Sequence, residues 1–183
     1  MRKIILSALA GTAALAASPA FAQGADNGTA FSGGHIEAIS GYDHVSDGGG
    51  SGVLYGIGAG WDYRTRNAVV GIEGEVLEST TGQCVGNNVC VDASRDFYIG
   101  GRVGVVVAPN VLLYGKIGYT NARVEVTSGN VSDSTNLDGI RGGAGLEWQF
   151  RNSPLSLRAE YRYSNYEQGV ERHQGTLGLA FRF

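Results

Sequence analysis

The chain has 183 residues, of which 14 are basic and 17 acidic, with a formal net charge of −3 at pH 7. This length suits one domain, and the acidic balance argues against nucleic-acid binding, because domains that bind nucleic acid are normally basic.

The composition includes 30 glycines but only 3 prolines and 2 cysteines. Glycine at this density often marks low complexity, yet these glycines lie inside alternating segments. We therefore expect them to leave room for bulky neighbours in a tightly curved sheet.

The N-terminus has the features of a cleaved signal peptide over residues 1–22. Arg2 and Lys3 precede the apolar run 4–17, and a small-x-small cleavage motif ends at Ala22. The alternative, a membrane anchor, needs about 20 apolar residues, and this run is shorter. No later apolar stretch approaches the length of a spanning helix. If the protein crosses a membrane, we therefore expect it to cross as strands.

After cleavage, the 183 residues less 22 leave residues 23–183 as one domain of 161 residues, which contains eight segments of alternating character. The predicted strands are Gly34–Tyr42, Val53–Tyr63, Val69–Leu77, Asp96–Val107, Val111–Arg123, Ile140–Phe150, Leu155–Tyr163 and Arg172–Phe183. Period two is the side-chain repeat of a strand. One face of each segment is apolar, whereas the other carries small or charged residues. This polarity is typical of a barrel whose outer face meets lipid.

The predicted connections alternate in length along the chain. The short ones are 64–68, 108–110 and 151–154, and the longer ones are 43–52, 79–95, 124–138 and 165–170. Outer-membrane barrels have short turns on the periplasmic side and long loops outside the cell. The sequence therefore predicts an all-β fold, an eight-stranded antiparallel up-and-down transmembrane β-barrel.

Outward aromatic residues fall into two groups, one at each end of the predicted strands. The first comprises Trp61, Tyr63, Trp148, Phe150, Phe181 and Phe183, and the second comprises Tyr42, Tyr55, Phe97, Tyr119, Tyr161 and Tyr163. Two such girdles match the two interfaces of a bilayer. The alternative is that these residues are present simply because aromatic side chains favour strands.

Charged residues of both signs lie on the face predicted to line the lumen. They are Glu37, Glu73, Glu75, Glu147 and Glu160 with Arg102, Lys116, Arg141, Arg158, Arg162 and Arg182. An eight-stranded barrel is only wide enough for side chains, and an unpaired buried charge is costly, so these residues should pair. We hypothesise a charge-paired polar plug that closes the lumen to all but water or small ions. Acid–base catalysis by Glu73 and Glu75 is the alternative, but lumen-facing strands carry such glutamates without catalysis.

The two cysteines, Cys84 and Cys90, enclose five residues in a predicted loop. An even pair in an exported chain favours a disulfide, and a structural zinc site would need two further ligands nearby. A link over so short a span constrains the unfolded chain by roughly 2 kcal/mol and would mainly shape the loop tip.

The remaining polar residues give no catalytic or metal-binding pattern. His35, His44 and His173 are scattered, and no Ser/His/acid set can be assembled around them. Four predicted loop acids, Asp43, Asp47, Asp133 and Asp138, lack the ordered spacing of a calcium site, which favours solvated side chains. We therefore expect no enzyme activity, no cofactor and no metal.

Several segments resemble the small outer-membrane β-barrel family of opacity-type and OmpA-OmpX-like surface proteins, the porin family. They are RVGVVVAPNVLLYGKIGY from Arg102, VVGIEGEV around Glu73, GGAGLEWQF from Gly142 and LRAEYRY from Leu157. The resemblance runs from about Phe31 to Phe183. It implies that the terminal Phe183 is the aromatic end signal that the outer-membrane assembly machinery reads.

This resemblance implies a location in the outer membrane of a Gram-negative bacterium. It also implies three kinds of partner: outer-membrane lipid with lipopolysaccharide, the assembly machinery, and a surface ligand or host receptor. We expect a structural or surface-interaction role, namely loop presentation, envelope integrity and adhesion. Two alternatives remain: a narrow passive pore, and a soluble periplasmic lipocalin-like barrel.

Overall fold

The computed structural model describes residues 30–46, 50–80, 82–85, 89–128, 131–166 and 170–183, with the backbone alone for 82–85, 89–94, 124–128 and 131–135. The predicted signal peptide, residues 1–22, lies outside this part of the chain. The strands are β1 Gly33–Val45, β2 Ser51–Thr65, β3 Ala68–Ser79, β4 Gly82–Val85, β5 Val89–Ala108, β6 Val111–Ser128, β7 Val131–Gln149, β8 Leu155–Tyr166 and β9 Glu171–Arg182.

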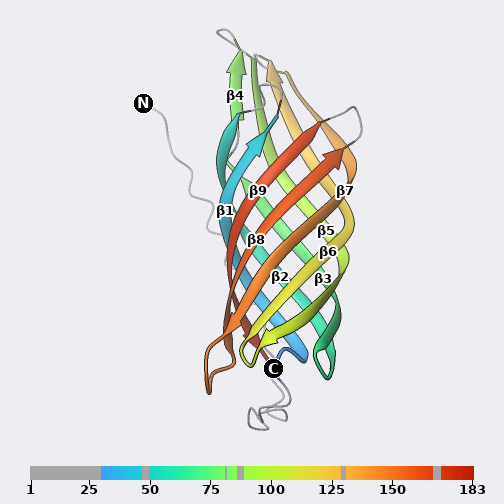
Figure 1. The fold of residues 1–183 in the computed structure, drawn as a ribbon. Coiled ribbons are helices and arrows are strands. Elements are labelled where there is room, and N and C mark those ends of the chain that lie inside the picture. The colour runs from blue at the N-terminus through green and yellow to red at the C-terminus, as the bar shows by residue number, and fades with distance from the viewer. Residues whose placement is uncertain (1–29, 47–49, 81, 86–88, 129–130, 167–169) are drawn as a thin grey trace.

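Eight of these strands form a closed antiparallel ring (Figure 1). Each barrel strand pairs with its neighbour in sequence, β3 pairs directly with β5, and β1 pairs with β9 to close the ring. The short strand β4 pairs with β5 alone, beyond the point where β3 ends. The eight-stranded antiparallel up-and-down barrel predicted from the alternating segments is confirmed.

The connections divide the barrel into two ends. The turns at 66–67, 109–110 and 150–154 define the short-turn end, which also holds the C-terminus, and the opposite end is the long-loop end (Figure 1). At the short-turn end, Arg66 and Asn152 adopt positive φ, as tight turns require. Three connections were therefore predicted correctly, since strands resume at Ala68, Val111 and Leu155.

The prediction of long loops over 79–95 and 124–138 was wrong. Most of these residues continue β5, β6 and β7, and pairing between β5 and β6 runs out to Val89 opposite Ser128. A register shift between Ala93 and Arg95 marks where β5 leaves the barrel wall. Polar composition suggested loops, but neighbouring strands satisfy each other's backbone hydrogen bonds even where neither face is covered.

The outer surface of the barrel is apolar. Ile57, Ile72 and Ile99 are 66%, 69% and 67% exposed, and they form part of an aliphatic band between the two ends. Outward aromatic side chains flank the band: Trp61, Tyr63, Trp148, Phe181 and Phe183 towards the short-turn end, and Tyr42, Tyr55, Tyr119 and Tyr161 towards the other. Within the part of the chain described here, no helix is long and apolar enough to cross a membrane.

Inward-facing glycines make space for the charged residues of the lumen. A Cβ at Gly60 would lie 2.7 Å from the His35 ring, and one at Gly145 would lie 2.7 Å from Cγ of Glu160. Outward-facing Gly175, by contrast, has open space where its side chain would be. The expectation that glycines accommodate bulky neighbours is confirmed for the inner face.

Candidate functional site

The lumen holds a network of buried ion pairs along the barrel axis. Its arginines are almost completely shielded from solvent: Arg141 and Arg162 are 0% exposed and Arg158 is 1% exposed. These side chains reach the axis because their strands place every second residue inside the ring. The network has three layers, which follow here from the short-turn end to the long-loop end.

The first layer centres on Asp62 of β2 and Glu147 of β7. Arg102 donates from Nε to Asp62 over 2.7 Å and from Nη1 to Glu147 over 3.1 Å. Arg182, on the last strand, also bridges both acids, with a 2.7 Å contact to each. His35 Nδ1 lies 3.2 Å from Asp62. Two acids thus share two arginines, which ties β2, β5, β7 and β9 together.

The middle layer has Arg158 of β8 at one side. Its guanidinium pairs with Glu37 and lies 3.2 Å from Glu73, 3.6 Å from Glu147 and 3.7 Å from Glu160. Arg158 therefore contacts acids from β1, β3, β7 and β8 and joins the first layer to the second. Glu37 has no other cation within ion-pair distance among the residues that the structure describes.

Lys116 and Arg162 complete the middle layer. Lys116 Nζ lies 2.7 Å from Glu73, 2.5 Å from Glu75 and 3.2 Å from Glu160. Arg162 donates from Nη1 to Glu75 over 2.8 Å and from Nε to Glu160 over 2.6 Å. Glu73 and Glu75, two residues apart on one strand, therefore both pair with cations inside the lumen.

The third layer lies nearest the long-loop end. Arg141 pairs with Asp96 and donates to the Ser164 hydroxyl over 2.9 Å. Arg172 lies 3.1 Å from the same Asp96 and donates from Nε to Asp43 over 2.7 Å. These contacts link β1, β5, β7, β8 and β9 at the outer rim.

Two tyrosines line the network and lie under its cations. The Tyr114 ring centroid is 5.1 Å from the Arg102 guanidinium and 5.0 Å from that of Arg158. Lys116 Nζ lies 4.7 Å from the Tyr98 centroid. Such cation–π contacts are most favourable where water is excluded, and both tyrosines are 3% exposed.

Phe31 closes the lumen at the short-turn end. Its side chain is fully buried and packs in one cluster with Val69, Leu112 and Tyr114. The Phe31 amide donates to the Gln149 side chain over 3.3 Å. Phe31 also has φ of +64°, an uncommon conformation for a residue with a side chain. The segment before β1 therefore turns inward and places an aromatic ring below the first ionic layer.

The eleven charged residues singled out from the sequence all take part in this one network. They are Glu37, Glu73, Glu75, Arg102, Lys116, Arg141, Glu147, Arg158, Glu160, Arg162 and Arg182. Their contacts lock the strands together and place each carboxylate against a cation. An ion passing along the axis would have to displace these pairs.

Sequence reasoning omitted four further members of the network: Asp43, Asp62, Asp96 and Arg172. The alternation had placed Asp62 on the polar face, which was sufficient to find it. Asp96 and Arg172 stood at predicted strand ends, where no face was assigned. The interpretation of Asp43 as a solvated loop acid was wrong, because β1 continues to Val45 and buries Asp43 completely.

The other predicted loop acids have separate outcomes. Asp138 lies in β7 and accepts hydrogen bonds from Tyr119 and, over 2.6 Å, from Asn121. Asp47 lies outside the described residues, as does the side chain of Asp133.

The cysteine side chains also lie outside the described part, but the backbone places Cys84 directly opposite Cys90 in the β4–β5 pair. Directly opposed residues in antiparallel strands have Cα atoms about 4.5–5.5 Å apart, within the range that a disulfide spans. The disulfide therefore remains a prediction with which the register agrees.

Phe183 lies at the seam between the first and last strands. Its amide donates to the Gly34 carbonyl over 2.8 Å, and the Gly34 amide donates back to the Phe183 carbonyl over 3.0 Å. The side chain faces outward and is 57% exposed. The terminal residue thus takes part in ring closure and leaves its ring on the outer surface.

Comparison with known proteins gives consistent matches. The family model of the outer membrane protein beta-barrel domain matches residues 7–183. The 25 kDa outer-membrane immunogenic protein of Brucella ovis is 27% identical over 125 residues, which cover 68% of this chain and 61% of that protein. The chain thus spans about three fifths of the length of this curated relative.

Two solved structures share the fold. The attachment invasion locus protein Ail of Yersinia pestis is 20% identical, with 82% of this chain and 99% of that chain covered and a TM-score of 0.60. A second structure of Ail holds the heparin analogue sucrose octasulfate. Neisserial surface protein A is 14% identical, with 83% and 98% covered and a TM-score of 0.60.

Proposed function

The chain belongs to the outer-membrane protein β-barrel family and lies in the outer membrane, and from this premise we propose that it is a sealed barrel that presents a rigid surface for interaction outside the cell. In this role the barrel anchors the protein and contributes to envelope integrity. The partner binds at the long-loop end, which such barrels direct outward.

The observation that carries this proposal is the length of β5, β6 and β7. These strands have 20, 18 and 19 residues, whereas β8 and β9 have 12 each. A membrane-spanning strand needs only about 9–11 residues. Strand β5 continues for six residues, 89–94, beyond Arg95, its last residue paired with β3, or roughly 20 Å along the strand at about 3.4 Å per residue. Strands β4–β7 thus form a paired extension beyond the bilayer, at the upper end of Figure 1.

The charge of this extension indicates the class of partner. Residues 82–95 and 122–138 contain four acids, Asp92, Glu125, Asp133 and Asp138, against two bases, Arg95 and Arg123. A surface with this balance attracts basic or neutral partners and repels polyanions. We therefore expect no binding of sulfated polysaccharide, in contrast to Ail, which binds a heparin analogue.

The alternatives have less support. A passive pore needs an open path, but three layers of ion pairs and Phe31 occupy the lumen. A soluble lipocalin-like barrel would have a polar exterior, but this exterior is an apolar band. For catalysis, we propose that the barrel has none, because the lumen carboxylates are each held by a cation.

A strain that lacks the protein, complemented with two forms of it, tests this role. One form is wild type, and in the other a two-residue Asn-Gly turn replaces residues 122–137. The shortened form should restore resistance to detergent but lose adhesion to host cells, because the barrel remains while the β6–β7 part of the extension is removed and the outer part of β5 loses its partner strand. Equal adhesion by the deletion, shortened and wild-type strains would refute the surface role, and loss of the folded form on unboiled gels would identify a folding defect instead.

A further inference from the structure

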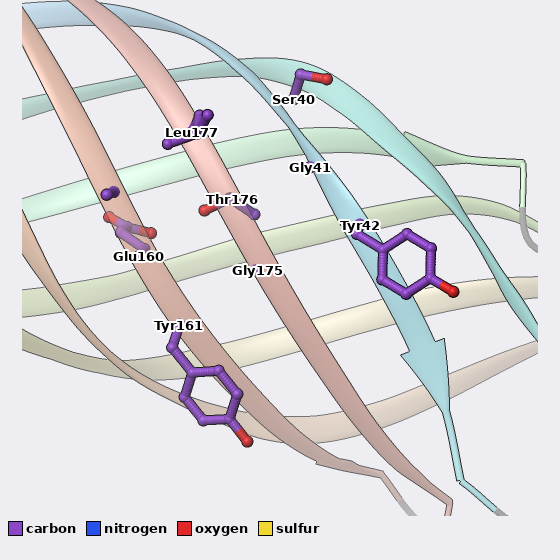
Figure 2. A pocket seen from close by; sticks show the side chains of 9 residues that line it. Ser40, Gly41, Tyr42, Glu160, Tyr161, Gly175, Thr176 and Leu177 are labelled. Atoms are coloured by element: carbon purple, nitrogen blue, oxygen red, sulfur yellow. The ribbon is translucent and has the colours of Figure 1, made fainter.

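Residues 131–138, the outer part of β7, are paired on one side only. In the barrel wall each strand has a neighbour on both sides, as β9 lies between β8 and β1 around Gly175 (Figure 2). Strand β7 pairs with β6 out to Val131, opposite Ser128, but its pairing with β8 begins at Gly139. Among the described residues, no strand pairs with the other side of 131–138. This segment is therefore an open edge of the extension, at the upper end of Figure 1.

Backbone groups along this edge are available for pairing with a further strand. In an antiparallel pair, alternate residues direct their N–H and C=O groups away from the partner strand, so about four donors and about four acceptors of residues 131–138 point to the open side. The edge is about 27 Å long at about 3.4 Å per residue. It can therefore take a segment of about eight residues in extended conformation.

The edge also lacks features that keep exposed strands from pairing. Lysine, proline and β-bulges commonly protect such strands. Residues 131–138 read VSDSTNLD, without lysine, arginine or proline, and the β6–β7 register has no shift over its described length, whereas the β5–β6 register has two. The opposite edge of the extension, β4, has only four residues. Strand β7 is thus the edge at which a further strand fits.

A second copy of the chain in the same membrane is a poor occupant of this edge. Two barrels with the same orientation in one membrane are related by a rotation about the membrane normal, so their β7 strands would run parallel. At equal height, Asp133 would then lie beside Asp133 of the other copy, and Asp138 beside Asp138. Like charges in neighbouring positions destabilise a strand pair. The charge of the edge therefore favours a different chain.

We propose that the edge of β7, residues 131–138, binds an extended basic segment of a partner protein as an added strand. The proposal rests on the surface role proposed above and names the class of partner. Main-chain hydrogen bonds supply the affinity in this mode of recognition. Asp133 and Asp138 lie on the edge, and Glu125 of β6 lies opposite Ser134. An added strand with lysine or arginine opposite the two aspartates gains cross-strand ion pairs.

Fluorescence anisotropy with the refolded mature protein in neutral detergent tests the proposal. The probes are three labelled eight-residue peptides: one of alternating lysine and threonine, the same peptide with every backbone amide N-methylated, and one of alternating glutamate and threonine. The lysine peptide should bind saturably. The other two should bind at least about tenfold more weakly, because N-methylation removes the main-chain donors and glutamate reverses the charge.

Each peptide result has a definite meaning. Equal binding of the N-methylated peptide would overturn strand addition, and equal binding of the glutamate peptide would overturn the basic partner. The absence of saturable binding by the lysine peptide would overturn both.

Hydrogen exchange of the complex locates the bound peptide. Amide protons of residues 131–138 that face the open side should gain protection with the lysine peptide, whereas those of β4 should not. Protection gained at β4, or none gained at 131–138, would overturn the choice of edge.

A pair of charge variants tests recognition at the edge itself. Asp133→Asn should weaken binding of the lysine peptide about threefold by removing one cross-strand ion pair. Glu78→Gln, the matched control at an exposed acid of β3, should bind as wild type does. Unboiled gel mobility checks that each variant is folded. Equal weakening by both variants would show long-range attraction only and would overturn recognition at the edge.

The surface role has a separate outcome. Adhesion that is lost when residues 122–137 are replaced, together with failure of peptide binding, would keep the surface role and overturn strand addition. Adhesion that does not depend on residues 122–137 would overturn the surface role itself.

Discussion

Replacing Arg158 with methionine removes the cation at the junction of the first and middle layers. Arg158 has four carboxylates within ion-pair distance, but three of them keep another cation: Glu73 keeps Lys116, Glu160 keeps Lys116 and Arg162, and Glu147 keeps Arg102 and Arg182. Only Glu37 depends on Arg158 among the described residues. The variant therefore leaves one buried carboxylate unpaired, while methionine preserves most of the side-chain volume.

The expected loss follows from that single unpaired charge. Removing one partner of a buried pair costs about 3–5 kcal/mol, so we expect Arg158→Met to lower the free energy of unfolding by about 4 kcal/mol. Glu37→Gln should cost less, about 1–2 kcal/mol, because Arg158 keeps three other acids. The double variant should be less destabilised than the sum of the single changes by about 2 kcal/mol.

Reversible urea unfolding in phospholipid vesicles measures these differences. The fluorescence of Trp61 and Trp148 reports the loss of lipid contact, since both side chains face outward. Arg151→Met, at an exposed residue of a short turn, is the matched control and should change stability by less than about 0.5 kcal/mol. If Arg158→Met cost under about 1 kcal/mol, or if it and Glu37→Gln were additive, the ionic network would not stabilise the barrel as argued.

Three further predictions concern the seam, the lower closure and the external hairpin. Gly33→Ala should reduce the folded fraction on unboiled gels, because Gly33 has φ of +100° and an added Cβ would lie 2.6 Å from the Phe183 carbonyl oxygen. Phe31→Ala should lower the free energy of unfolding by about 3 kcal/mol in the same urea assay, since it empties a buried aromatic site. Cys84 and Cys90 should resist thiol labelling until a reductant is added, and reduction should leave the urea midpoint of the barrel unchanged, because β4 lies outside the ring.

Each of these has a result that would contradict it. A normal folded fraction for Gly33→Ala would mean that the seam tolerates a side chain next to the last residue. An unchanged midpoint for Phe31→Ala would show that the aromatic ring does not contribute to closure. Labelling of the cysteines without reductant would exclude the disulfide.

The barrel could be predicted from the sequence because its signals are local and repeated. Alternation over Val53–Tyr63 assigns each side chain to one of two environments, and the environment outside is lipid. Charges such as Glu73 and Lys116 then mark the lumen, since period two sends them all to the same side. The lumen pairs themselves could not be predicted, because partners such as Arg158 and Glu37 are 121 positions apart and meet only after the ring closes.

The incorrect predictions concerned polar segments, because loops and strands outside the membrane can have the same polar composition. Asp92 and Asp133 occur in polar stretches that suggested loops, but pairing between neighbouring strands continues through both. The polarity of a residue reflects its surroundings, and both faces of a strand outside the membrane meet water. Such a strand therefore has no apolar face by which the sequence could reveal it. Asp43 was misplaced for a different reason: the predicted strand ended at Tyr42, three residues before the end of β1, and so left out a member of the buried network.

Conductance across a planar bilayer tests most directly the claim that this barrel is a sealed surface protein. With the refolded wild-type protein inserted, we predict no steady current above the bilayer baseline, because ion pairs fill the lumen at three levels and Phe31 closes its lower end. Arg158→Met should at most add brief, small openings. A large and steady single-channel current through the wild-type protein would contradict the account and would make the protein a pore.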